Sequence, residues 1–120
     1  QIRTMSNSVC DLGGSSYRFK RIYGNVMCLV VNYGAPSGSF SPSVTYNVVI
    51  VDKSNSPTMT LFSASIYDTG FFLYVKTTGT GTLTIDPSGT QTVDGSTTYA
   101  VTGAYKSVTL VSDGSNWLTL

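Results

Sequence analysis

The chain of 120 residues contains no histidine, no glutamate and only two cysteines. A zinc site needs about four ligands, usually Cys and His, so this sequence cannot build one. The lack of histidine also excludes a Cys–His or Ser–His nucleophile pair. Cys10 and Cys28 either pair as a disulfide or stay free, and Cys28 falls in an apolar run that suits a small core residue.

Charged side chains are scarce as well, at 11% of the residues, with a net charge of +1. A typical domain has about 25% charged residues, and a nucleic-acid surface needs a clear basic excess. Arg18, Lys20 and Arg21 cluster, but three cations are better explained as a solvated rim. No apolar run approaches the roughly 18 residues of a membrane-spanning helix. We therefore expect neither a nucleic-acid partner nor membrane insertion.

A chain of this length forms one domain at most. It is long enough to bury roughly two thirds of the surface that its unfolded chain exposes, so an ordinary core is possible. The chain begins with Gln1 rather than Met, and no signal peptide is evident. We therefore expect a fragment cut from a longer protein.

Small hydroxyl residues dominate the composition, with 17 serines and 17 threonines. Strong helix formers are few, whereas Val, Thr, Tyr and Phe suit the half-buried surface of a sheet. Turns rich in Asp, Gly and Pro recur at spacings of roughly 8 to 20 residues, which is typical of sandwiches and barrels. The pattern predicts an all-β fold of about eight or nine strands, an antiparallel β-sandwich of jelly-roll type.

The predicted strands differ in how many of their two faces are apolar and must be buried. Residues 26–32 form an almost continuous apolar run, which indicates a strand buried on both faces. Residues 58–67 form another strand. Residues 44–51 alternate instead, and one face of this strand carries Val44, Tyr46, Val48 and Ile50.

The segment 71–76 is apolar on both faces. Phe71, Leu73 and Val75 share one face of this predicted strand, and Phe72 and Tyr74 share the other. Asp68 to Gly70 precede it as a hairpin turn. Both faces therefore need a neighbour, and we expect other copies of the chain to cover the second face and to protect the strand edges.

All six carboxylates are aspartates, and five of them lie at predicted turns. Asp is favoured there because its side chain caps its own turn. Asp86 and Asp94 could act as a glycosidase acid and base, but the turn interpretation is strongly favoured. Calcium needs about six oxygen ligands, and no Asp-rich loop supplies them. We expect no enzyme activity, no catalytic or metal-binding residue and no cofactor.

Two parts of the sequence resemble bacteriophage and related viral fibre proteins. Residues 11–24, DLGGSSYRFKRIYG, are similar to the fibre signature DLGSSSYRFKDIY, which usually marks the end of a thin trimeric shaft. The segments 81–89, 93–99 and 108–117 are similar to a repetitive ending of phage structural proteins. The resemblance implies that residues 1–24 end a shaft or neck and that residues 25–120 form the distal head domain.

The resemblance further implies a parallel homotrimer at the tip of a fibre on the virion surface. For a virus assembled in a cytosol, both cysteines are expected to be reduced. The apolar residues expected at the trimer interface are Leu12, Tyr17, Phe19, Ile22, Tyr23, Phe72 and Tyr74.

The expected partner of such a head is a host cell-surface receptor, with a glycan as one candidate. Tyrosine offers a flat, rigid contact surface with a polar tip, and polar loops lie beside two of the tyrosines. The candidate receptor-binding residues are Tyr33, Asp52, Lys53, Asn55, Tyr67 and Asp68. The alternatives are a purely structural trimerisation or capping domain, a capsid-decoration domain, and a depolymerase of surface polysaccharide.

Overall fold

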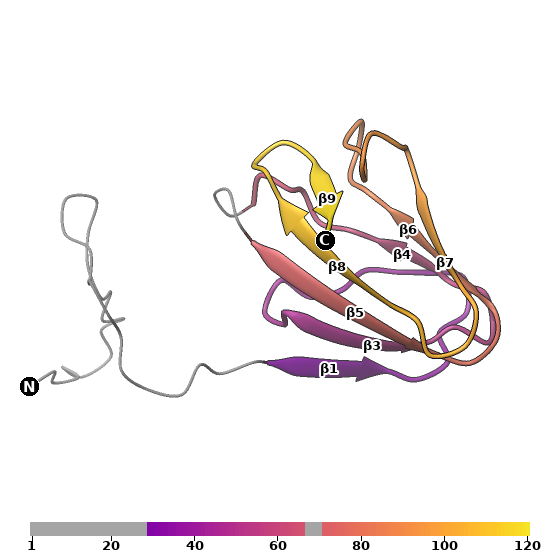
Figure 1. Ribbon diagram of the computed structural model, residues 1–120. Coiled ribbons are helices and arrows are strands. Elements are labelled where there is room, and N and C mark those ends of the chain that lie inside the picture. Colours follow the sequence, from indigo (N-terminus) through magenta and orange to yellow (C-terminus); the bar gives the residue numbers. More distant parts are fainter. Residues whose placement is uncertain (1–28, 67–70) are drawn as a thin grey trace, which may run out of the picture.

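The computed structural model describes residues 29–66 and 71–120. These residues form two β-sheets that face each other across one core, as in a sandwich, and they contain no helix (Figure 1). The prediction of an all-β fold is therefore confirmed. Within the described residues, no helix is long and apolar enough to cross a membrane.

The described residues form nine strands. The five-stranded sheet has the order β1-β3-β5-β8-β9 and consists of β1 (Val30–Tyr33), β3 (Val48–Asp52), β5 (Phe72–Thr78), β8 (Ser107–Ser112) and β9 (Trp117–Thr119). The four-stranded sheet has the order β2-β4-β6-β7 and consists of β2 (Ser39–Phe40), β4 (Thr58–Thr60), β6 (Thr82–Asp86) and β7 (Tyr99–Thr102).

The first six strands wind back and forth between the two sheets. Each odd-numbered strand of this part lies in the five-stranded sheet and each even-numbered one in the four-stranded sheet. The chain therefore returns to each sheet in the same direction, and neighbouring strands pair in parallel. The expected antiparallel pairing is wrong here, because the chain turns across to the other sheet instead of reversing within one.

The last three strands reverse the direction of the chain. β7 pairs antiparallel with β6, and β8 pairs antiparallel with both β5 and β9. Antiparallel pairing is thus confirmed only for this C-terminal part. A jelly roll consists of antiparallel Greek keys, so the parallel winding of β1 to β6 also contradicts the jelly-roll topology.

Alternate residues of the strands point between the sheets and form one buried cluster. Burial of each such aliphatic side chain contributes about 1.5–3 kcal/mol. Trp117 is fully buried, and its ring lies edge-on to Phe62 with centroids 5.6 Å apart, so this residue belongs to the core. The cluster includes Val49, Val51, Leu73, Val75, Leu83, Ile85, Val101, Leu110 and Trp117.

Three predicted strands differ from those observed. β1 is an edge strand and Val30 is 50% exposed, so the expected burial of this run on both faces is wrong. β3 begins only at Val48, so Val44 and Tyr46 precede the strand; Val48 and Ile50 share a face as predicted, and Val49 and Val51 on the other face are buried in the core. β4 ends at Thr60, six residues before the last described residue of its predicted range.

Asp94 and Gly95 form one of the turns that the sequence predicts at its aspartates, and the structure confirms it. Val93 and Ser96 exchange two backbone hydrogen bonds, of 2.8 and 2.9 Å, across this two-residue loop. Both central residues have positive φ, 49° at Asp94 and 82° at Gly95. Asp-Gly is the residue pair that adopts this tight hairpin turn most readily, because Asp tolerates the left-handed region and Gly is unrestricted there.

Candidate functional site

The outer face of the five-stranded sheet carries large exposed apolar side chains. In β5, Leu73 and Val75 point into the core, so the alternation of the strand turns Phe72 and Tyr74 outward. Phe72 remains 40% exposed and Tyr74 43% exposed. Their rings are stacked, with centroids 6.2 Å apart and planes inclined by 15°. The predicted alternation of this strand is therefore confirmed.

The strand register places further apolar residues beside these two rings. Val30 of β1 pairs with Val48 of β3, which pairs with Tyr74. Phe72 pairs with Val111 of β8, which pairs with Leu118 of β9. We call the set of six the outer apolar face: Val30, Val48, Phe72, Tyr74, Val111 and Leu118. Large contiguous apolar surfaces are rare on monomeric proteins, so this face is a candidate interaction site.

The charged residues of this sheet, Asp52 and Lys76, lie at the other end of its outer face. Lys76 follows Tyr74 by one pleat, and its Nζ donates a hydrogen bond to the Tyr105 carbonyl at 2.7 Å. Asp52, at the end of β3, pairs with Thr78 at the end of β5. The sheet therefore presents an apolar end, where β3 and β5 begin, and a polar end, where they finish.

Two of the predicted receptor-binding residues, Tyr33 and Asn55, make side-chain contacts with other parts of the chain. Tyr33 packs on Phe40 with ring centroids 5.0 Å apart, and its hydroxyl accepts a hydrogen bond from the Ser43 backbone at 3.3 Å. Asn55 is exposed, and its side-chain amide donates to the Ala35 carbonyl at 3.1 Å. Asn55 therefore connects the β3–β4 corner to the preceding β1–β2 corner, whereas the contacts of Tyr33 stay within the first turn of the winding.

Asp52 and Lys53 stand at the corner between β3 and β4. The Asp52 carboxylate accepts hydrogen bonds from the Ser54 hydroxyl at 2.6 Å and the Ser54 backbone at 3.0 Å, which lower its pKa. Lys53 is fully buried, and its Nζ donates to the Gly79 carbonyl at 2.6 Å. The interpretation of Lys53 as a receptor contact is wrong, because no part of the residue reaches the surface.

Two glycines allow the β5–β6 corner to lie against the Lys53 corner. A Cβ on Gly81 would overlap the Lys53 carbonyl oxygen, and a Cβ on Gly79 would overlap the side chains of Asp52 and Ser54. Residues 52–57 are mostly polar, and by composition alone they are typical of an exposed turn. Only the stacking of the second corner on the first explains why a lysine is buried there.

The remaining predicted residues lie outside the described part of the chain. They are the receptor candidates Tyr67 and Asp68, the interface candidates Leu12, Tyr17, Phe19, Ile22 and Tyr23, and the two cysteines. Of the predicted trimer interface, the described residues thus include Phe72 and Tyr74, and both lie on the outer apolar face.

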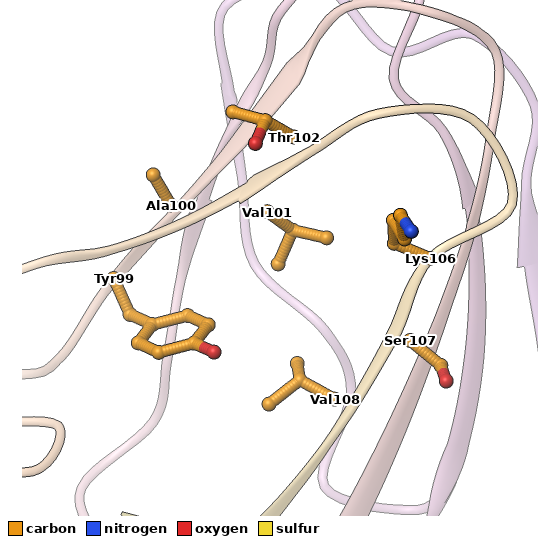
Figure 2. A pocket seen from close by; sticks show the side chains of 7 residues that line it. All are labelled: Tyr99, Ala100, Val101, Thr102, Lys106, Ser107 and Val108. Carbon is orange, nitrogen blue, oxygen red and sulfur yellow. The ribbon is translucent and has the colours of Figure 1, made fainter.

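A cavity of about 220 Å³ lies at the edge of the sandwich, between β7 and β8. Figure 2 shows the ring of Tyr99 and the methyl groups of Val101 and Val108 directed toward the same space, while Ala100 points away from it. Lys106 lies at the other side of this space. Sequence reasoning missed the cavity, because nothing in either segment indicates that β7 and β8 face each other.

Two of the aspartates cap their own turns: Asp52, through Ser54, and Asp113. Asp113 Oδ1 accepts hydrogen bonds from the backbones of Asn116 at 2.7 Å and Ser115 at 2.9 Å, and these bonds lower its pKa. The Asp94 carboxylate accepts from the side chain and backbone of Thr119, which lowers its pKa in the same way. In residues 29–66 and 71–120, no three Cys or Asp side chains gather closely enough to hold a metal ion.

No known protein family matches this chain, and no curated protein is similar to it at a significant level. The functional argument therefore depends on the surfaces of the molecule itself. Two features of the described residues stand out: the outer apolar face and the cavity between β7 and β8.

Proposed function

We propose that this chain is the distal domain of a viral fibre, which assembles as a parallel homotrimer and attaches the particle to a host surface. The observation that carries the proposal is the outer apolar face, with the stacked pair Phe72 and Tyr74 near its centre. A lone domain in water would leave this face uncovered. Its proposed occupant is the same face of two further copies.

The arrangement of the face supports a partner that is another copy of the chain. The charged residues of the sheet, Asp52 and Lys76, lie away from the apolar end, so three copies could bring their apolar ends together without burying a charge. Closed cyclic symmetry repeats one interface around its axis, so no copy of that interface is left unpaired. The fibre-like segment at residues 11–24 supports the same stoichiometry, because fibre shafts are trimeric.

The mass of the chain in solution tests the assembly. Light scattering at micromolar concentration is expected to give about three times the 12.8 kDa of one chain. A stable mass of one chain would refute the trimer and, with it, the physical basis of the fibre proposal.

The attachment role follows from the position of the domain at the end of a fibre. Three weak sites on one fibre, and many fibres on one particle, raise the apparent affinity without any new contact. Binding of the chain to intact host cells, and its competition with whole particles, tests this role. A trimer that binds no host surface would favour the alternative, a structural domain that only nucleates and caps the fibre or decorates a capsid.

A further inference from the structure

We propose that the cavity between β7 and β8 binds an acidic monosaccharide unit, a sugar ring that carries a carboxylate. This inference rests on the proposed attachment function and deepens it, since it names the chemistry of the receptor. The site is distinct from the outer apolar face, because its apolar walls belong to the inward-facing residues of the two sheets.

The walls of the cavity suit the face of a sugar ring. Tyr99 is half-buried and contributes a flat aromatic surface, and Val101 and Val108 are almost fully buried beside it. Aromatic side chains combine such a flat surface with a polar tip, here the Tyr99 hydroxyl. The volume of about 220 Å³ is below the roughly 300–1,000 Å³ of sites for drug-sized ligands, so a single small ring matches it better.

The charge of the cavity selects an anion. Lys106 is the one charged residue among the seven that line it, and no lining residue is acidic. Its side chain is exposed, and its ammonium has no hydrogen-bond or ion-pair partner among the described residues. Lys106 is therefore free to form a charge-assisted hydrogen bond with a carboxylate.

The chain around Lys106 is held in place before any ligand arrives. The Lys106 carbonyl accepts hydrogen bonds from the backbone and the hydroxyl of Thr77, at 2.8 and 2.9 Å. The neighbouring carbonyl of Tyr105 accepts the bond from Lys76. Gly103 has a φ of 87°, and a Cβ there would lie 3.2 Å from Lys106 Cε, so the glycine leaves room for the lysine side chain. Such preorganisation lowers the entropy cost of binding.

The backbone of β7 supplies the remaining polar groups. β7 is the outer strand of its sheet, so the side of the strand away from β6 presents N–H and C=O groups that no strand partner uses. These groups suit the hydroxyls of a sugar ring. An added peptide strand is the less favoured occupant, because β7 offers only four residues of edge.

The test is a titration of the isotope-labelled full chain, followed by its amide NMR shifts, with sodium glucuronate, glucose and sodium acetate. Glucuronate is expected to shift residues 99–108 with a dissociation constant on the order of 1 mM. Glucose lacks the carboxylate that would bind Lys106, and acetate lacks the sugar ring that would pack on Tyr99. Each is therefore expected to bind at least about tenfold more weakly. Equal responses to glucuronate and acetate, or to glucuronate and glucose, would overturn the proposal.

Variants locate the interaction. Lys106→Gln is expected to weaken glucuronate binding about tenfold or more, whereas Lys106→Arg, which keeps the charge, retains it within about threefold. Tyr99→Ala is expected to lose binding, and thermal melts check that each variant stays folded. Unchanged affinity in Lys106→Gln, or shifts confined to another part of the chain, would contradict the assignment.

Failure of this site and failure of the fibre proposal give different results. A trimer that binds host cells but not glucuronate overturns only the acidic-sugar site. A monomer that binds glucuronate through Lys106 refutes the trimer and leaves the site intact.

Discussion

The rings of Phe72 and Tyr74 lie stacked on the outer face of the five-stranded sheet, with centroids 6.2 Å apart. They are two residues apart in β5, and the intervening Leu73 is fully buried. The same strand thus contributes to the core with one face and to an uncovered apolar surface with the other. This relationship is the physical basis for expecting a partner on that surface.

Replacing both rings is expected to dissociate the proposed trimer. In the double variant Phe72→Ser/Tyr74→Ser, each copy loses two apolar contacts of the interface, each contributing on the order of 2 kcal/mol. Light scattering at micromolar concentration should then give the mass of one chain, and the circular dichroism spectrum should keep its β character because neither ring belongs to the core.

An exposed tyrosine elsewhere serves as the matched control. Tyr105 is 69% exposed and lies in the loop before β8, away from the outer apolar face. Its φ is 54°, so Tyr105→Asn fits the backbone without strain. This variant should keep the parental mass. An unchanged mass in the Phe72/Tyr74 variant would show that the subunits meet elsewhere.

A side chain at Gly81, in the corner between β5 and β6, is expected to destabilise the fold. A Cβ there would overlap the Lys53 backbone carbonyl, so the two corners would have to separate. Gly81→Ala should lower the free energy of unfolding by about 1–3 kcal/mol, measured by urea denaturation. Gly34→Ala is the control, because no atom lies within 4 Å of its added methyl group. Equal stabilities of the two variants would show that the corners are not packed in this way.

Lys53 is expected to stabilise the same corner through its ammonium. Lys53→Met keeps most of the buried side-chain volume but leaves the Gly79 carbonyl without its donor. The loss should be about 1–3 kcal/mol of unfolding free energy. Lys76→Met removes a comparable bond at an exposed site, to the Tyr105 carbonyl, and should cost about 0.5 kcal/mol or less. A Lys53→Met protein as stable as its parent would contradict this role.

The Asp94 carboxylate is expected to make stability sensitive to acid. Hydrogen bonds from Thr119 hold its folded-state pKa below the ordinary value of 3.8. Its contribution is therefore complete above about pH 4 and is lost as the pH falls through the lowered pKa. Urea midpoints between pH 7 and pH 2 should fall less steeply in acid for Asp94→Asn than for the parent.

A second variant assigns this acid sensitivity to the contact itself. Thr119→Val keeps the carboxylate but removes the hydroxyl that donates to Asp94 Oδ2. It should reduce the acid slope, but less than Asp94→Asn does, because the backbone N–H of residue 119 still donates to Asp94 Oδ1. Part of the slope remains in both variants because Asp52 and Asp113 have lowered pKa values too. If both variants keep the full parental slope, the contact does not contribute to the acid response.

The success of prediction from sequence depended on how local each feature is. The outward position of Phe72 and Tyr74 follows from alternation within one strand, and the Asp94–Gly95 turn follows from the preferences of two adjacent residues. The phase of β3 was harder to predict, because Val48 to Val51 are all apolar and either alternate set could face the core. The burial of Lys53 had no signal within its own segment.

Residue chemistry along the chain was sufficient to establish the all-β character, several turns and the two apolar faces of β5, because each depends on neighbours in sequence. The tertiary structure decided the parallel winding of β1 to β6, the burial of Lys53 under Gly79 and Gly81, and the meeting of Tyr99 with Val108 and Lys106. An alternating strand determines which side chains share a face, but it contains no information on its direction or on the strand across the core. Those relationships arise only when distant segments pack together.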